Sequence, residues 1–393
     1  MPLPTSACDA PDATGNPTAL MAALKSVIEQ TIAPQADEVD ATGRFPRSGV
    51  EALGRAGILG ATSATTVGGG GVPLGQAVDF VREIARSCGS TAMVVLMHYA
   101  ATAVIEEHGP DKTRRAIAEG SHLTSLAFSE VGSRSHFWAP VGTATPDGES
   151  VRLDARKSWV TSADQADSYV WSSRPLRADG PMSLWLVPGD APGLTVAGAF
   201  DGLGLRGNAS CPMTAERLTV PATALLGADG AGLDLALAIA LPRFLVLSAA
   251  CSLGTMDAAM ELTRTHLTRT RLSHLDQTLA DQPTVRARYA PLRIRTDEVS
   301  AFLDDTVAAL ECGRADATLR VLQVKAVAAE AAHDVTSEAM RLCGGSALRR
   351  ESGLERRFRD ALVSRVMAPT TDALYDFVAR ASLGLPVFGE AGK

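Results

Sequence analysis

Two segments of the chain carry side chains that suit the binding of a flat ligand with a polar edge. One runs from Ser125 to Gly132 and the other, about thirty residues on, from Lys157 to Ala163; each is a short apolar strand pattern ending in small hydroxyl residues. Trp159 and Thr161 are two positions apart, so a regular strand would turn both to one face. There the indole can pack on a ring system such as a flavin while the hydroxyl bonds its heteroatoms. Taken alone, a Trp-x-Thr strand is more often part of a core.

Other motifs have simpler structural explanations. Residues 202–207 fit the pattern G-x-G-x-x-G, which in a dinucleotide-binding fold is followed by a long helix. The residues that follow here, up to Pro212, cannot begin such a helix, so a loop is predicted. The tetraglycine at 68–71 is predicted to be a surface loop. The seven histidines show no metal-ligand spacing. His98 lies in an apolar helical run, where a buried structural histidine is the common case.

The elements that position these residues change type twice along the 393 residues. Residues 1–17 are predicted to be a frayed tail. Residues 18–122 have helical patterns at 19–32, 49–56, 75–87 and 91–107, whereas 123–228 contain short strands and an Asp147-Gly148 hairpin turn. Residues 229–393 are helical again, and one apolar helix face runs from Val321 to Leu342 and ends at Gly344-Gly345. The prediction is an α+β chain, mostly α, with a β-rich domain between helices.

Composition excludes several classes of function. The net charge is −7 without a dominant basic patch, which disfavours nucleic-acid binding. The six cysteines form no C-x-x-C pair, so neither a zinc site nor a disulfide framework is indicated. The most apolar stretch, Leu233 to Leu253, is interrupted by Asp234, Pro242 and Arg243, which predicts a buried helix and no membrane span. No signal-peptide pattern is visible at the start, and a cytoplasmic protein is expected.

The ordered motifs resemble those of acyl-CoA dehydrogenases over nearly the whole chain. Ser129-Glu130-Val131-Gly132 stands where that family has Thr-Glu-Pro-Gly, and Lys157-Ser158-Trp159-Val160-Thr161 where it has Lys-x-Trp-Ile-Thr. Further matches follow in the same order at residues 202–207, 220–227, 344–345 and 354–360. The resemblance implies an N-terminal helical domain (18–122), a central β-barrel-like domain (123–228) and a C-terminal four-helix bundle (229–393).

The resemblance also implies FAD as cofactor and a set of residues that hold it. Trp159 and Thr161 would flank the flavin ring, and Thr370 would touch the diphosphate. Either Arg269 or Arg271 would reach the FAD of a neighbouring subunit. The remaining expected contacts lie at the polar edge, at the phosphate side or near a partner's cofactor: Phe128, Ser129, Ser135, Gly344 and Gly345. The expected partners are an acyl-CoA or acyl-carrier thioester, an electron-acceptor flavoprotein or oxygen, and further copies in a homotetramer or homodimer.

One departure from the family pattern concerns the catalytic base. Ala368 stands where the family has its glutamate, and Pro242 occupies the alternative position, so neither known site holds a carboxylate. A substitute base from Asp372, Asp376 or His98 is one explanation. A second is oxygenation by a reduced-flavin monooxygenase of the same fold, in which a histidine often occupies the helix of His98. The third is a non-catalytic protein that binds flavin or an acyl group.

Overall fold

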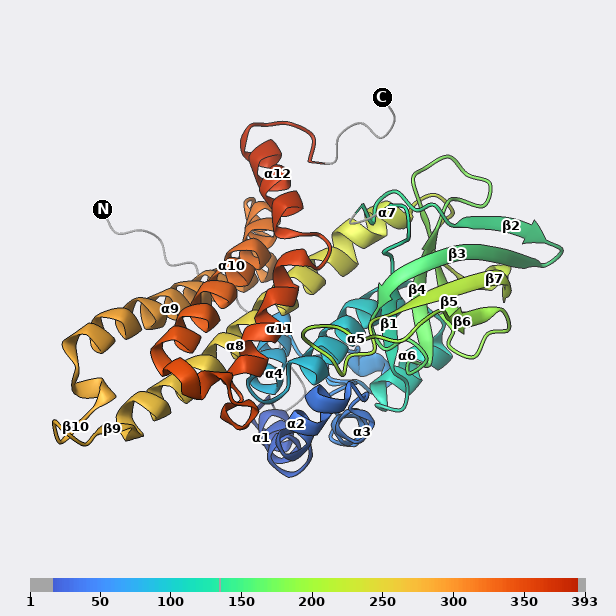
Figure 1. The fold of residues 1–393 in the computed structure, drawn as a ribbon. Helices are drawn as coiled ribbons and strands as arrows, with labels where there is room; N and C mark the ends of the chain where they lie inside the picture. The colour runs from blue at the N-terminus through green and yellow to red at the C-terminus, as the bar shows by residue number, and fades with distance from the viewer. Residues whose placement is uncertain (1–16, 134–135, 388–393) are drawn as a thin grey trace.

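The computed structural model describes residues 17–133 and 136–387, and its elements follow the predicted order of helices, strands and helices (Figure 1). The first zone contains α1 (Pro17–Val27), α2 (Ala33–Thr42), α3 (Arg47–Arg55), α4 (Leu74–Ser87), α5 (Gly89–His108) and α6 (Asp111–Ala118). A π-helical turn, Ile28–Ile32, joins α1 to α2, so the helix predicted at 19–32 continues to Thr42. α5 is buried on nearly every face, because its sequence is apolar all round.

The central zone consists of two four-stranded sheets. The first has the order β1 (Thr124–Ala127), β4 (Ser168–Ser173), β5 (Ser183–Pro188) and β8 (Leu225–Leu226), with β1 and β4 parallel. The second has the order β2 (Thr143–Asp147), β3 (Ser150–Val160), β7 (Cys211–Pro221) and β6 (Leu194–Val196), and is antiparallel. Asp147 pairs with Ser150 across the predicted hairpin, and Gly148 takes a φ of 63°. The hairpin prediction is confirmed.

The last zone is a helical bundle built around α10 (Ala317–Cys343), which packs against α8 (Leu241–Arg269), α9 (Pro283–Glu311), α11 (Leu354–Val366) and α12 (Thr371–Ser382). Between α8 and α9 a small hairpin, β9 (Arg271–Leu272) with β10 (Gln277–Thr278), lies at the end of the bundle remote from the sheets (Figure 1). The predicted apolar face of α10 is buried, from Val321 through Val335 to Ala339, and Gly344 caps the helix. The predicted fold class is confirmed.

The most apolar stretch forms one continuous helix, residues 232–269, made of α7 (Gly232–Leu235), a π-helical turn (Ala236–Ala240) and α8. It is long and apolar enough to cross a membrane, but 67% of its most apolar window is buried inside the protein, as a core helix would be. Among the described cysteines, Cys88, Cys211, Cys251 and Cys343 are free and buried.

Candidate active site

A cavity of about 1030 Å³ opens where the three zones meet. One side, which we call the β wall, is formed by Phe128, Ser129, Ser158, Trp159, Thr161 and the loop containing residues 200–210. The opposite side, the helical wall, is formed by Met93 and Met97 of α5, by residues between 236 and 244, by Glu330 of α10, and by residues between 362 and 372. Five of the predicted cofactor residues line this one cavity: Phe128, Ser129, Trp159, Thr161 and Thr370.

Trp159 owes its position to an irregularity in β3. The pairing of β3 with β7 shifts register between Lys157 and Val160, and Trp159 has a φ of 58°, unusual for a bulky residue. Its side chain is 70% exposed, on the cavity. Thr161 follows the end of β3, and its hydroxyl lies 3.1 Å from that of Ser210. Both residues face the cavity, but through a bulge rather than through the regular alternation predicted from the sequence.

A buried ion pair holds the two motif segments of the β wall together. The ammonium of Lys157 donates to the carboxylate of Glu130 and, at 2.7 and 2.8 Å, to the carbonyl and hydroxyl of Ser172. The second carboxylate oxygen of Glu130 accepts from the backbone N–H groups of Val141 and Gly142. Burial lowers the pKa of Lys157 to about 8 against the opposing influence of Glu130. The pair therefore fixes the segments that present Ser129 and Trp159.

The N-terminus of α12 meets the cavity at Thr370, Thr371 and Asp372. The Thr370 hydroxyl accepts a hydrogen bond from the N–H of Ala373 at 3.3 Å and so caps the helix. The Thr371 hydroxyl is buried and has no hydrogen-bond partner in the described part of the chain. A helix N-terminus with an unsatisfied hydroxyl beside it suits an anionic group such as a diphosphate.

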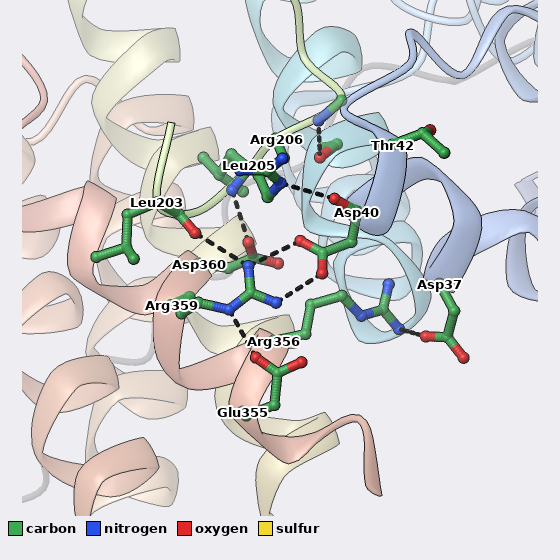
Figure 2. A network of polar contacts seen from close by, with 12 residues as sticks. Asp37, Asp40, Thr42, Leu203, Leu205, Arg206, Glu355, Arg356, Arg359 and Asp360 are labelled. Carbon is green, nitrogen blue, oxygen red and sulfur yellow. Dashed lines mark hydrogen bonds and ion pairs between the residues drawn. The ribbon is translucent and has the colours of Figure 1, made fainter. Parts of the chain in front are cut away.

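The glycine-rich loop at 202–207 is a loop, as predicted, and a charge network fastens it. Figure 2 shows Arg359 of α11 between Asp40 of α2, at 2.6 Å, and Glu355, also at 2.6 Å. Arg359 also donates to the carbonyl of Leu203, and the buried Asp360 carboxylate accepts from the N–H of Leu205 at 2.6 Å. A Cβ at Gly204 would lie 2.2 Å from a backbone oxygen of α11. The glycines permit close packing, and Arg359 and Asp360 of α11 hold the loop in place.

His98 does not line the cavity. Its ring is fully buried, Nδ1 accepts from the N–H of Thr124 at 3.1 Å, and Nε2 lies 3.1 Å from the carbonyl of Leu59. Since Nδ1 accepts, Nε2 carries the proton and donates. Burial lowers the pKa of His98 to about 4, so the ring is neutral near pH 7. This geometry is that of a structural residue tying α5 to β1, and it corrects the expectation of a catalytic role.

The carboxylates on the cavity are Glu330 and Asp372. Ala368 does line the cavity, at the position where the resemblance expects a glutamate. Glu330, on α10, accepts from Arg365 of α11 at 2.9 Å. Sequence reasoning missed Glu330 because a single glutamate in an Ala-rich helix looks like a solvated position. Asp376, the other carboxylate considered, forms an ion pair with Arg380 and does not line the cavity.

The remaining predicted residues lie elsewhere. Arg269 is exposed at the end of α8, and Arg271 on β9 forms an ion pair with Asp276. Gly344 and Gly345 are exposed, and a Cβ on either would meet no atom within 4 Å. None of the four lines the cavity of its own chain. Ser135 lies outside the described residues.

Comparison with known proteins identifies the family. The N-terminal, middle and C-terminal domains of acyl-CoA dehydrogenases match residues 16–120, 125–218 and 230–383. These three consecutive matches span most of the chain, which therefore belongs to the acyl-CoA dehydrogenase family. The members of this family are flavoproteins and oxidoreductases that act on CH–CH donors.

Individual relatives are distant but similar over nearly their whole length. The bovine mitochondrial short-chain specific acyl-CoA dehydrogenase is 27% identical over 352 residues, covering 88% of this chain and 84% of the relative. The solved butyryl-CoA dehydrogenase of Megasphaera elsdenii superposes with a TM-score of 0.87 at 20% identity, covering 93% of this chain and 98% of that one. The prolyl acyl carrier protein oxidase AnaB gives a TM-score of 0.84 at 20% identity, with 93% and 99% coverage. These structures share the fold.

Proposed function

We propose that this protein is a FAD-dependent oxidoreductase that oxidises the α,β-bond of an acyl thioester carried by CoA or a carrier protein. The observation that supports this most is the two-sided character of the cavity. Its β wall offers an exposed indole and hydroxyls, and its helical wall offers Met93, Met97 and Phe244 to an apolar chain. An aromatic, polar-edged side facing an apolar side suits a flavin and an acyl group bound together.

The residues present fit FAD. Trp159 would pack on the ring system, with Ser129 and Thr161 at its polar edge. The N-terminus of α12, with the unsatisfied hydroxyl of Thr371, would receive the diphosphate. When bound, the flavin would supply the acceptor for the hydride that leaves the β-carbon.

The chain must also accept the α-proton. Ala368 cannot do so, and His98 is held by two backbone groups. We therefore assign proton acceptance to a carboxylate of the helical wall, Glu330 or Asp372. The His98 geometry removes one of the two observations that favoured oxygenation, the other being the missing glutamate. The carboxylates on the cavity support dehydrogenation, which is the function we propose.

Assembly and location complete the proposal. Arg269, Arg271, Gly344 and Gly345 are exposed and do not line the cavity of their own chain, which suits a homotetramer or homodimer in which they approach a neighbour's cofactor. Electrons would pass to a flavoprotein acceptor or to oxygen, and the protein would work in the cytoplasm.

The test is anaerobic mixing of the FAD-loaded protein with a panel of acyl-CoA and acyl-carrier thioesters. Oxidation of the substrate bleaches the yellow flavin absorbance, and the matching enoyl thioester appears in the products. A Trp159→Ala protein serves as a control for the site. If the loaded protein keeps its colour with every thioester, the proposal fails.

A further inference from the structure

We propose that Lys325 is a positioning residue that holds residues 366–370 in the conformation that lines the cavity. The identity of the bound ligand rests on the proposed function, whereas the role of Lys325 in holding the segment does not. Lys325 lies on α10, and its side chain is 1% exposed. Lys325 does not itself line the cavity and acts on it through the backbone of residues 366–370, which we call the cavity loop.

The ammonium of Lys325 donates to three carbonyl oxygens. These belong to Ser364 at 3.0 Å, Met367 at 2.7 Å and Pro369 at 2.7 Å. Ser364 lies in the last turn of α11, where carbonyls lack partners within the helix, and the other two residues flank Ala368. Three carbonyl acceptors require three N–H donors, which an ammonium has and a neutral amine lacks.

These bonds decide which way the cavity loop faces. The carbonyl of Met367 and the N–H of Ala368 share one peptide plane and point in opposite directions, as do the carbonyl of Pro369 and the N–H of Thr370. With both carbonyls turned onto Lys325, both N–H groups turn away from α10. Neither N–H has a hydrogen-bond partner within the described residues, and both residues line the cavity. The lysine thus leaves two backbone donors free for a ligand.

A purely structural explanation fits poorly, because the position is costly for a charge. Desolvation lowers the pKa of Lys325 to about 7, and no carboxylate contributes to the shift. Three charged groups on helices packed against α10 are engaged or at the cavity: Arg365 of α11 pairs with Glu330, Arg243 of α8 donates to the carbonyl of Ile239, and Asp372 of α12 lies on the cavity. An apolar side chain would fill the same space more cheaply but would not hold the loop.

The experiment compares Lys325→Met with Val321→Ala, a truncation of a buried residue one helical turn away that does not line the cavity. Hydrogen exchange of the apoprotein measures the protection of residues 364–372. We expect this segment to exchange about tenfold faster in Lys325→Met than in the wild type, because charge-assisted hydrogen bonds are lost. Exchange of remote segments should not change, and the thermal midpoint should fall by less than a global loss of stability of that size would require. Val321→Ala should lower the thermal midpoint without singling out this segment. Lys325→Gln, which keeps two donors, should be intermediate.

A second readout is FAD affinity, measured by quenching of flavin fluorescence on titration with apoprotein. Lys325→Met should bind about tenfold more weakly than Val321→Ala. Wild-type protection of residues 364–372 in Lys325→Met would overturn the inference. If that variant does not fold, Lys325→Gln decides: faster exchange of residues 364–372 than in Val321→Ala supports the inference, and wild-type protection of the segment overturns it. Because exchange needs no flavin, a failure of the proposed function would show separately, as absent bleaching.

Discussion

The two walls of the cavity differ in how much of the family pattern they keep. The β wall retains the segments around Ser129 and Trp159 and locks them with the fully buried pair of Glu130 and Lys157. The helical wall includes the loop at 366–370 but carries Ala368 where the resemblance expects a carboxylate. Under the proposed function, the residues that would hold the flavin and those that would accept the proton lie on different walls, so the two sets can change separately.

Breaking the lock of the β wall should have the largest effect. Lys157→Met leaves the carboxylate of Glu130 buried without its cation, and we expect a loss of about 3–5 kcal/mol in the free energy of unfolding. Denaturant unfolding of the apoprotein measures it. The double variant Glu130→Gln/Lys157→Met, which removes the charge as well, should recover part of the loss. A loss below about 1 kcal/mol in the single variant would show that the pair does not hold this wall.

Restoring the missing carboxylate on the helical wall should have the next largest effect. Ala368→Glu places a general base at the family position, and we expect anaerobic flavin reduction by an acyl-CoA to accelerate on the order of 10²-fold. Ala368→Gln is the matched control for size. Equal rates for the two variants would show that the loop no longer places this side chain beside the substrate.

Replacing Trp159 separates binding from backbone strain on the β wall. Both Trp159→Gly and Trp159→Ala remove the indole and should weaken FAD binding. Only glycine relieves the φ of 58°, so the glycine variant should be more stable than the alanine variant by about 1 kcal/mol. Thermal unfolding of the two apoproteins measures the difference, and equal stability would contradict a strained bulge.

The smallest effect on activity is expected from His98. Its folded pKa of about 4 lies below the ordinary value of 6.5, so the unfolded chain binds more protons between these pH values. Stability is thus retained above pH 6.5 and lost as the pH falls toward 4, while the pH profile of activity near neutrality shows no inflection from this ring. Ring chemical shifts of labelled histidine, followed by NMR, provide the measurement. Titration of His98 near pH 6.5 would contradict the buried geometry.

The sequence predicted the fold because local patterns and tertiary packing agree. The apolar face from Val321 to Ala339 and the Asp147-Gly148 turn each specify one structure, and both are present. On the β wall the motif residues were predicted, but the bulge that turns Trp159 into the cavity was not. That bulge depends on the pairing of β3 with β7, which the sequence around Trp159 does not determine by itself.

The sequence was least informative where a role depends on contacts between distant helices. Glu330 and Lys325 occupy an Ala-rich helix, and only the packing of α11 and α12 against α10 brings them to the cavity and its loop. His98 shows the converse. Its helix was predicted correctly, but the direction of its ring follows from the carbonyl of Leu59 and the N–H of Thr124, which come from other segments.

The continuous helix from Gly232 to Arg269 joins two remote places on the molecule. Near its start, Ala236, Ala240 and Phe244 form part of the cavity, and Arg269 ends it beside the β9–β10 hairpin. At 1.5 Å per residue, the 29 residues of α8 span about 43 Å, so each degree of bending near Pro242 swings the far end by about 0.7 Å. A change of bend in this helix would therefore alter the cavity and displace the hairpin at the same time.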